Sequence, residues 1–139
     1  MRKTSNDINI TNLLQGAGLR STRQRLALGA LLFDGIHKHV TAEQMFAAAR
    51  KNQVPVSLAT IYNTLHQFTE AGLLREVVID SARVYFDTNT HDHHHFFNET
   101  EGFLTDIPAA SVHVDRLPKL PAGLSLDRVD VIVRVRSKG

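Results

Sequence analysis

The segment from Ser57 to Gly72 has the clearest secondary-structure signal in this 139-residue chain. Its apolar residues recur at steps of three and four, as along one face of an α-helix. They are Leu58, Ile61, Leu65 and Phe68. Ser57 is of a residue type that caps helix N-termini, and Gly72 stands where a left-handed residue after the helix is favoured. We therefore expect a helix that buries one face and exposes the other.

The exposed face of this helix differs from an ordinary solvated surface because it holds no Lys or Arg. Its side chains are small, hydroxyl, amide or aromatic: Thr60, Asn63 and Gln67, flanked by Ala59, Tyr62 and His66. Base edges in the major groove of DNA are read by groups of this kind. The face is therefore a candidate surface for contacts with bases.

The elements expected around this helix outline a winged helix-turn-helix. Three helices precede it: one from Ile8 to Gly16, one that begins after Thr22 and ends at Asp34-Gly35, and one from Thr41 to near Asn52. Two strands follow, Leu73–Ile79 and Arg83–Asp87, joined by a tight turn at residues 80–82. In a winged helix the third or fourth helix enters the major groove and the hairpin touches phosphate. Winged helices also serve as protein-interaction modules, so the topology leaves both functions open.

Charge is unevenly spread along the chain. Residues 1–51 hold eight Lys or Arg against three acids, whereas residues 89–139 hold six against seven. This bias is typical of a nucleic-acid-binding domain joined to a second module, although solvated helix faces produce it too. Hydrophobic residues make up 42% of the chain, and no apolar stretch has the length of a bilayer span or a secretory signal. We expect a globular cytoplasmic protein without a membrane partner.

Four of the eight histidines fall within five residues, at positions 91 and 93–95, with Asp92 between them. Imidazole binds transition metals and haem iron, and the chain has no cysteine to compete. In a strand, His93 and His95 would share one face, and Asp92 and His94 the other. Metal or haem binding is the favoured interpretation, and a solvated polar loop is the alternative.

The chain after this cluster is poor in helix signals. Short strands are expected at Phe96-Phe97 and Phe103-Leu104, and an alternating strand at residues 129–136. Three or four short strands make too small a core for a separate domain, so a partner sheet from a second subunit is expected.

Three runs of the sequence are similar to the ferric uptake regulator family. They are residues 17–25, AGLRSTRQR, residues 39–43, HVTAE, and residues 57–62, SLATIY, the last followed by Leu65, Phe68, Ala71, Gly72 and Leu73. The run 93–97, HHHFF, falls where the family has its His-rich strand, and without cysteine it most resembles the iron response regulator branch of the alpha-proteobacteria. The resemblance covers nearly the whole chain. It implies an α+β fold with a winged-helix DNA-binding domain, residues 1–88, and a small α/β dimerisation and sensing domain, residues 89–139.

The resemblance also implies a function. We expect an iron-responsive transcriptional regulator, mainly a repressor and not an enzyme, that binds an AT-rich palindromic DNA operator as a homodimer. The implied site for a divalent ion (Fe, Mn or Zn) consists of His39, Asp87, His93 and His95, with Asp106 as a further candidate ligand. The residues expected to contact DNA are Arg20, Arg25, Ser57, Thr60, Tyr62, Asn63 and Arg83. Asn63 stands where the family usually has Arg, which predicts a shifted base preference.

The chain departs from the family at two sites. Many members hold a structural zinc with Cys-x-x-Cys pairs, whereas this chain reads Asn98-Glu99-Thr100-Glu101, so no zinc site of that type is expected. A second site of His91 or Asp92 with His94 has only His113 nearby and Val129 where a histidine is expected. His94 is thereby left for haem, and His93, His94 and His95, beside Phe96 and Phe97, are the candidate haem-binding residues.

Two other functions remain as alternatives. His93-x-His95 followed by Glu99 matches the metal motif of cupin oxygenases, but a cupin needs a Gly-rich β-barrel around it and the preceding residues are mainly helical. A passive metal-binding protein is the third candidate, and binding to a defined duplex would exclude it.

Overall fold

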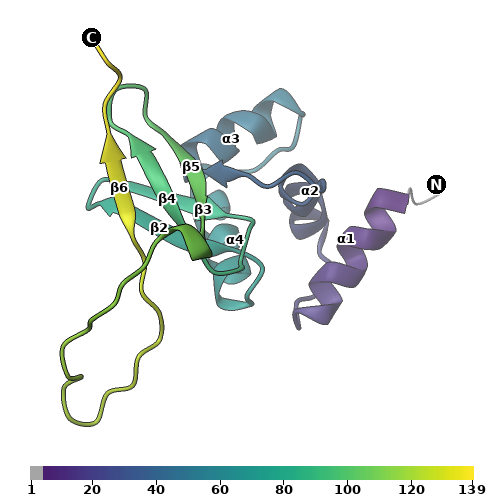
Figure 1. The fold of residues 1–139 in the computed structure, drawn as a ribbon. Coiled ribbons are helices and arrows are strands. Elements are labelled where there is room, and N and C mark those ends of the chain that lie inside the picture. The colour runs from purple at the N-terminus through teal and green to yellow at the C-terminus, as the bar shows by residue number, and fades with distance from the viewer. Residues whose placement is uncertain (1–4) are drawn as a thin grey trace. The chain divides into compact units, whose positions relative to one another are not determined.

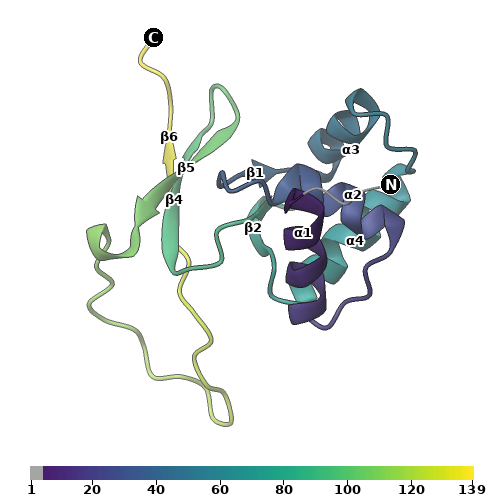
Figure 2. The same cartoon turned by 90° about the vertical axis from the view of Figure 1, so that its right-hand side faces the viewer.

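A computed structural model describes residues 5–139, which fall into two compact units with the boundary after Thr90. The first unit contains helices α1 Ser5–Gly16, α2 Arg23–Leu32, α3 Ala42–Lys51 and α4 Leu58–Glu70, and strands β1 His39–Val40, β2 Arg75–Asp80 and β3 Arg83–Asp87 (Figure 1). The second unit contains strands β4 His93–Asn98, β5 Phe103–Pro108 and β6 Ile132–Val135, with one 3-10 turn, η1 Ala109–Ser111 (Figure 2). This is the α+β architecture expected from the sequence, with the described helices of four residues or more confined to the first unit.

Three of the expected helix starts are fixed by side-chain caps. The hydroxyls of Thr22, Thr41 and Ser57 each accept a hydrogen bond from the backbone N–H three residues later, at 3.2, 3.1 and 3.1 Å. Such caps satisfy N–H groups that a helix leaves without a partner. Gln44 closes a capping box by accepting from the backbone N–H of Thr41 at 3.0 Å. The local signals for α2, α3 and α4 are therefore confirmed.

Several expected boundaries were wrong, including those of the last strand, which covers Ile132–Val135 rather than residues 129–136. Helix α1 begins at Ser5 rather than at Ile8. Strand β2 begins at Arg75 rather than at Leu73, because the backbone N–H groups of Leu73 and Leu74 both bond to the carbonyl of Phe68. The chain can close the end of α4 in this way since Gly72 has a φ of +82°, the left-handed conformation that glycine favours.

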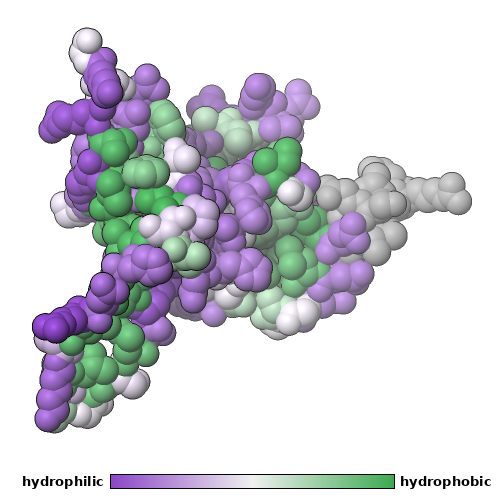
Figure 3. Space-filling view, viewed as in Figure 1, coloured by the Kyte–Doolittle hydropathy of each residue, from purple (hydrophilic) through white to green (hydrophobic). Residues whose placement is uncertain are grey.

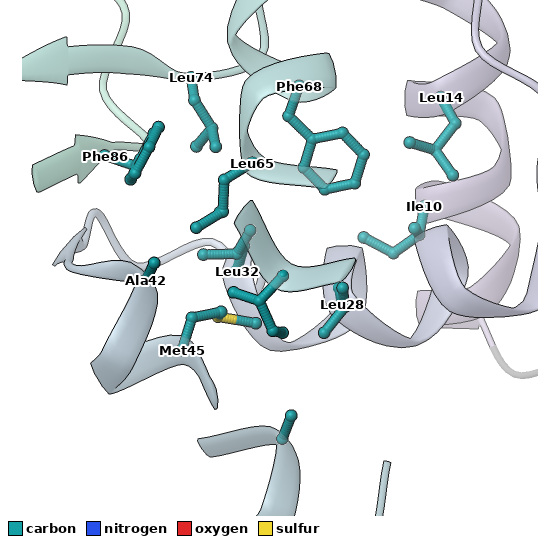
Figure 4. Close-up of a cluster of buried hydrophobic side chains, with 12 residues drawn as sticks. Ile10, Leu14, Leu28, Leu32, Ala42, Met45, Leu65, Phe68, Leu74 and Phe86 are labelled. Carbon is teal, nitrogen blue, oxygen red and sulfur yellow. The ribbon is translucent and has the colours of Figure 1, made fainter. Parts of the chain in front are cut away.

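Helix α4 lies in the middle of the first unit's core. Ile61, Leu65 and Phe68 are at most 1% exposed, which confirms the predicted apolar stripe. Ile10 and Leu14 of α1 point toward Phe68 in Figure 4. Burying a side chain of this size stabilises a fold by about 1.5–3 kcal/mol. The buried stripe therefore fixes which face of α4 remains available to a partner.

The sheet of the first unit has the order β1-β3-β2, and both pairings are antiparallel. Strands β2 and β3 form the predicted hairpin, with a two-residue turn at Ser81 and Ala82. Asp87 at the end of β3 stands opposite His39 of β1 on one side and opposite Arg75 of β2 on the other. Since directly opposed residues share a face of the sheet, these three side chains form one row.

The sheet of the second unit has the order β5-β4-β6, with β5 antiparallel and β6 parallel to β4. Residues 112–131 join η1 to β6 as a long loop without helix or strand, which both views show (Figures 1 and 2). One face of this sheet exposes Phe96, Phe103 and Val133 by 41, 46 and 37%. Apolar side chains gather on this sheet and along the loop in Figure 3. Most of the exposed large hydrophobic residues of the described chain lie in the second unit, and apolar surface of this kind suits contact with a partner.

None of the described helices combines the length and the apolar character that crossing a membrane requires.

Candidate metal and DNA-binding sites

Strand β4 places two of its histidines on one face. His93 and His95 are buried, whereas His94 between them points to the other face, as strand alternation predicts. Asp106 of β5 stands directly opposite His95. Its Oδ1 lies 3.4 Å from His93 Nε2 and 3.5 Å from His95 Nε2, and the ligand atoms of all three residues lie within 4.8 Å of one another. The strand pair thus brings together two imidazoles and one carboxylate.

A backbone contact sets the tautomer of His93. Its Nδ1 lies 2.5 Å from the carbonyl oxygen of His91, and since a carbonyl can only accept, Nδ1 must donate. In a neutral imidazole the lone pair is then on Nε2, the atom that faces Asp106. Histidines that bind metals are commonly oriented by such a contact at the other ring nitrogen. The ring is therefore prepared to bind an ion through Nε2.

The first unit contributes a second His–carboxylate pair. His39 Nε2 lies 3.2 Å from Asp87 Oδ2. The other carboxylate oxygen of Asp87 accepts the backbone N–H of Asn89 at 2.9 Å. That bond turns Oδ2 toward His39. The two sets of donors, imidazole nitrogens and carboxylate oxygens, suit Fe(II), Mn(II) or Zn(II).

His94 has a structural partner that sequence analysis did not find. The backbone N–H of Val131 donates to His94 Nδ1 at 3.1 Å, and the carbonyl of Val131 accepts from the backbone N–H of His95. His94 therefore anchors the residue just before β6 to β4. Because Nδ1 accepts, the proton of a neutral His94 is on Nε2, which then has no lone pair for iron. Of the two neighbouring aromatic residues, Phe97 is fully buried and only Phe96 is exposed.

The segment that stands in place of the Cys-x-x-Cys run forms a hydrogen-bonded turn. Asn98 Oδ1 accepts the backbone N–H groups of Thr100 and Glu101, both at 2.9 Å. Glu99 makes an ion pair of 2.8 Å with Arg134 of β6. Glu99 is therefore bound to strand β6 of the second unit. The described strands form two three-stranded sheets, whereas a cupin needs a barrel.

Most of the polar face of α4 is exposed as the sequence predicted, with Ala59, Tyr62, Asn63, His66 and Gln67 open to solvent, whereas Thr60 is half-buried. The hydroxyl of Tyr62 donates to Glu43 Oε1 of α3 at 2.7 Å. This hydrogen bond raises the pKa of Tyr62 and lowers the pKa of Glu43. Sequence analysis did not select Glu43, and its position in the first turn of α3 gave no signal of this contact.

Two of the arginines expected at DNA have partners within the first unit. Arg25 donates to Gln67 Oε1 of α4 at 3.0 and 3.3 Å and to the carbonyl of Arg20 at 3.0 Å. Arg83 lies on the β2–β3 hairpin, which is the wing of the winged helix, and makes an ion pair of 2.6 Å with Asp80. The Asp80 pKa is lowered chiefly by that hydrogen bond. The loop that contains Arg20 is thus tied to α4 through Arg25.

Two hollows flank the exposed face of α4. One, of about 330 Å³, lies between the start of α2 and α4 and is lined by Thr22, Gln24, Arg25, Thr60, Asn63, Thr64 and Gln67. The other, of about 410 Å³, is lined by residues of α3, α4 and the wing, including Glu43, Tyr62, His66 and Arg83. Ser57, a further predicted contact, caps α4, and its hydroxyl also donates to Thr60 Oγ1 at 3.0 Å. The predicted residues of α4 therefore border surfaces that a ligand can enter.

Comparison with known proteins agrees with this arrangement. Residues 16–121 match the model of the ferric uptake regulator family. The chain belongs to this family. Its members are metal-responsive transcriptional regulators.

Individual relatives give the extent of the likeness. The peroxide-responsive repressor PerR of Staphylococcus aureus strain Mu50 is 37% identical over 93 residues, which are 67% of this chain and 62% of the relative. The chain thus spans less than two thirds of the length of such relatives. The structure of the ferric uptake regulator from Pseudomonas aeruginosa with manganese has a TM-score of 0.71 and 25% identity, covering 94% of this chain and 98% of that one. The Vibrio cholerae regulator has the same TM-score, 21% identity and coverage of 91% and 98%, and it supports the fold.

Proposed function

We propose that this protein is a metal-responsive transcriptional regulator of iron homeostasis that binds AT-rich palindromic DNA as a homodimer and acts mainly as a repressor. The observation on which the proposal rests is the exposed face of α4, which has amide and hydroxyl groups but no Lys or Arg. A winged helix with such a face suits base recognition, and the same chain contains the His and Asp donors of a metal sensor.

We propose that one divalent ion is bound by His39, Asp87, His93, His95 and Asp106. The two donors of the first unit are too few to hold an ion alone, and the three of the second would leave positions of an Fe(II) or Mn(II) ion open for further ligands. The P. aeruginosa relative has manganese in its structure, so Mn(II) is the natural probe. His39→Ala and Asp106→Ala should each weaken the binding of a single Mn(II) per chain. Mn(II) affinity unaltered by His39→Ala would remove the first unit from the site.

For DNA recognition we propose that Thr60, Tyr62 and Asn63 meet bases, with Tyr62 at a thymine methyl group or a phosphate. The amide of Asn63 can bind adenine at two atoms, which favours AT-rich sites. Arg20 and Arg83 supply charge toward phosphate. Arg25 and Ser57 lie at the same surface, and their contacts within the unit orient the Arg20 loop and the start of α4.

The apolar face of the second unit's sheet supports the homodimer. Phe96, Phe103 and Val133 lie on one face, and a second copy that covered them would enlarge a core that three short strands alone make small.

Haem is a predicted second effector, as the resemblance to the iron response regulator branch implies. The hydrogen bond from the backbone N–H of Val131 to His94 favours the divalent ion over haem as the effector. A neutral His94 can bind haem iron only after this hydrogen bond is broken. Peroxide response, which names the S. aureus relative, is a further candidate for the signal.

The deciding experiment is a titration of the protein against labelled AT-rich palindromic and mixed-sequence duplexes, with and without Mn(II) and with and without haem. A regulator discriminates between the duplexes, and its affinity changes with the effector. Equal affinity for both duplexes in every condition, together with Mn(II) binding, would support the passive metal-binding protein instead.

A further inference from the structure

Arg75 lies in the row that contains the proposed metal ligands of the first unit. The strand register sets Asp87 directly between His39 and Arg75, so the three side chains share one face of the sheet. Asp87 is fully buried, and Arg75 is only 7% exposed. A buried arginine is uncommon, and it requires compensation by an opposite charge nearby. No sequence pattern marked Arg75 as a functional residue.

The two basic side chains of this row, Arg75 and His39, differ in whether they always have a positive charge. A guanidinium group keeps its positive charge at every ordinary pH, whereas an imidazole that binds a metal is neutral. Asp87 also accepts the backbone N–H of Asn89, which adds no net charge. In the metal-free protein, Arg75 is therefore the permanent positive charge of the row that contains the Asp87 carboxylate.

We propose that Arg75 is a positioning residue that substitutes for the ion in the metal-free protein and weakens the metal site so that the ion is released reversibly. The inference rests on the proposed metal site. Its physical basis is that a doubly charged cation gains less from a carboxylate that an adjacent guanidinium already balances. Removal of Arg75 destabilises the metal-free state because the buried Asp87 carboxylate loses the permanent positive charge of its row, although its contact with His39 remains. The same removal makes metal binding tighter.

The test measures the Mn(II) dissociation constant of the full chain by calorimetry, for the parent, Arg75→Met and Arg75→Lys. Arg75→Met should bind Mn(II) about tenfold more tightly, which corresponds to about 1.4 kcal/mol. Arg75→Lys retains the charge and should stay close to the parent. The matched control is Arg83→Met, which removes an arginine from the same sheet at an exposed ion pair and should leave the dissociation constant within about twofold.

The direction in which Arg75→Met changes the Mn(II) affinity distinguishes this role from simple structural support. A merely structural arginine would, when removed, loosen the site and weaken Mn(II) binding, so unchanged or weaker binding in Arg75→Met overturns the inference. If the parent itself binds no Mn(II), the proposed metal site fails and this inference fails with it. Equal affinities in parent and variant overturn the role of Arg75 alone.

A second readout needs no metal. In urea unfolding with a chelator present, Arg75→Met should destabilise the parent more than it destabilises Asp87→Asn, because the amide needs no counter-charge. Equal losses in the two backgrounds would contradict the proposed pairing of charges.

Discussion

Replacing Arg20 with Ala tests the proposed DNA surface without disturbing the fold. Arg20 lies in the exposed loop before α2, and its described bonds inside the unit are made by its carbonyl, which accepts from Arg25 and from the backbone N–H of Thr22, both at 3.0 Å. An alanine has the same carbonyl, so the tie between this loop and α4 is expected to persist. The substitution then removes one positive charge and little else.

The expected effect follows from counterion release. Each phosphate that a cation neutralises adds about −0.9 to the slope of log K against log salt for duplex DNA. The slope for Arg20→Ala should therefore be less steep than that of the parent by about one unit. Between about 50 and 200 mM salt, this changes the ratio of the two affinities by about 3.5-fold.

The assay is fluorescence anisotropy of a labelled mixed-sequence duplex at several salt concentrations, which needs no knowledge of the operator. Arg116→Ala removes the same charge from the exposed loop 112–131 of the second unit and should leave the slope unchanged. A slope that Arg20→Ala does not alter would refute the phosphate contact. Equal changes in both variants would show a general effect of net charge.

Three further outcomes follow from particular contacts. Gly29→Ala in α2 should destabilise the protein by about 1–3 kcal/mol in urea unfolding, because the new Cβ would lie 2.9 Å from Ile10 Cγ2 in the core; unchanged or higher stability would contradict this. Tyr62→Phe should raise the pKa of Glu43 toward its ordinary value, as NMR titration can measure. The stabilisation that the pair provides is present at neutral pH and is lost as the pH falls through the lowered pKa of Glu43, so the two proteins should converge in acid. Replacing His93, His94 and His95 together with Ala should abolish any haem-induced release from DNA, and release that persists in the variant excludes these histidines as the haem-responsive element.

The parts of the fold that the sequence predicted are those specified locally. The stripe of α4, the caps Thr22, Thr41 and Ser57, and the β2–β3 hairpin each depend on residues within a few positions of one another. The face assignment of β4 followed in the same way from strand alternation, which put His93 and His95 together.

Contacts between distant segments were beyond prediction from the residue pattern, and only the family resemblance grouped His39 with Asp87. The two-residue strand β1 exists only because it pairs with β3, far along the chain, and a pair such as His39-Val40 has no pattern of its own. Likewise, Arg25 and Gln67 are 42 residues apart, and Arg75 gains its position in the Asp87 row only from the register of β2. No local pattern in the sequence marks either of these contacts.

His94 shows how the two kinds of information combine at the proposed effector sites. Alternation correctly separated it from His93 and His95, and elimination then made it the haem candidate. The structure gives it another partner, the backbone N–H of Val131, which holds the start of β6 against β4. Since β6 contains Val133 of the proposed dimer face, haem that took His94 would act first on that face. An ion bound by His93 and His95 would instead lie on the opposite face of β4 from His94. Single replacement of His94 therefore separates a haem effect on dimerisation from a metal effect, which the triple replacement cannot do.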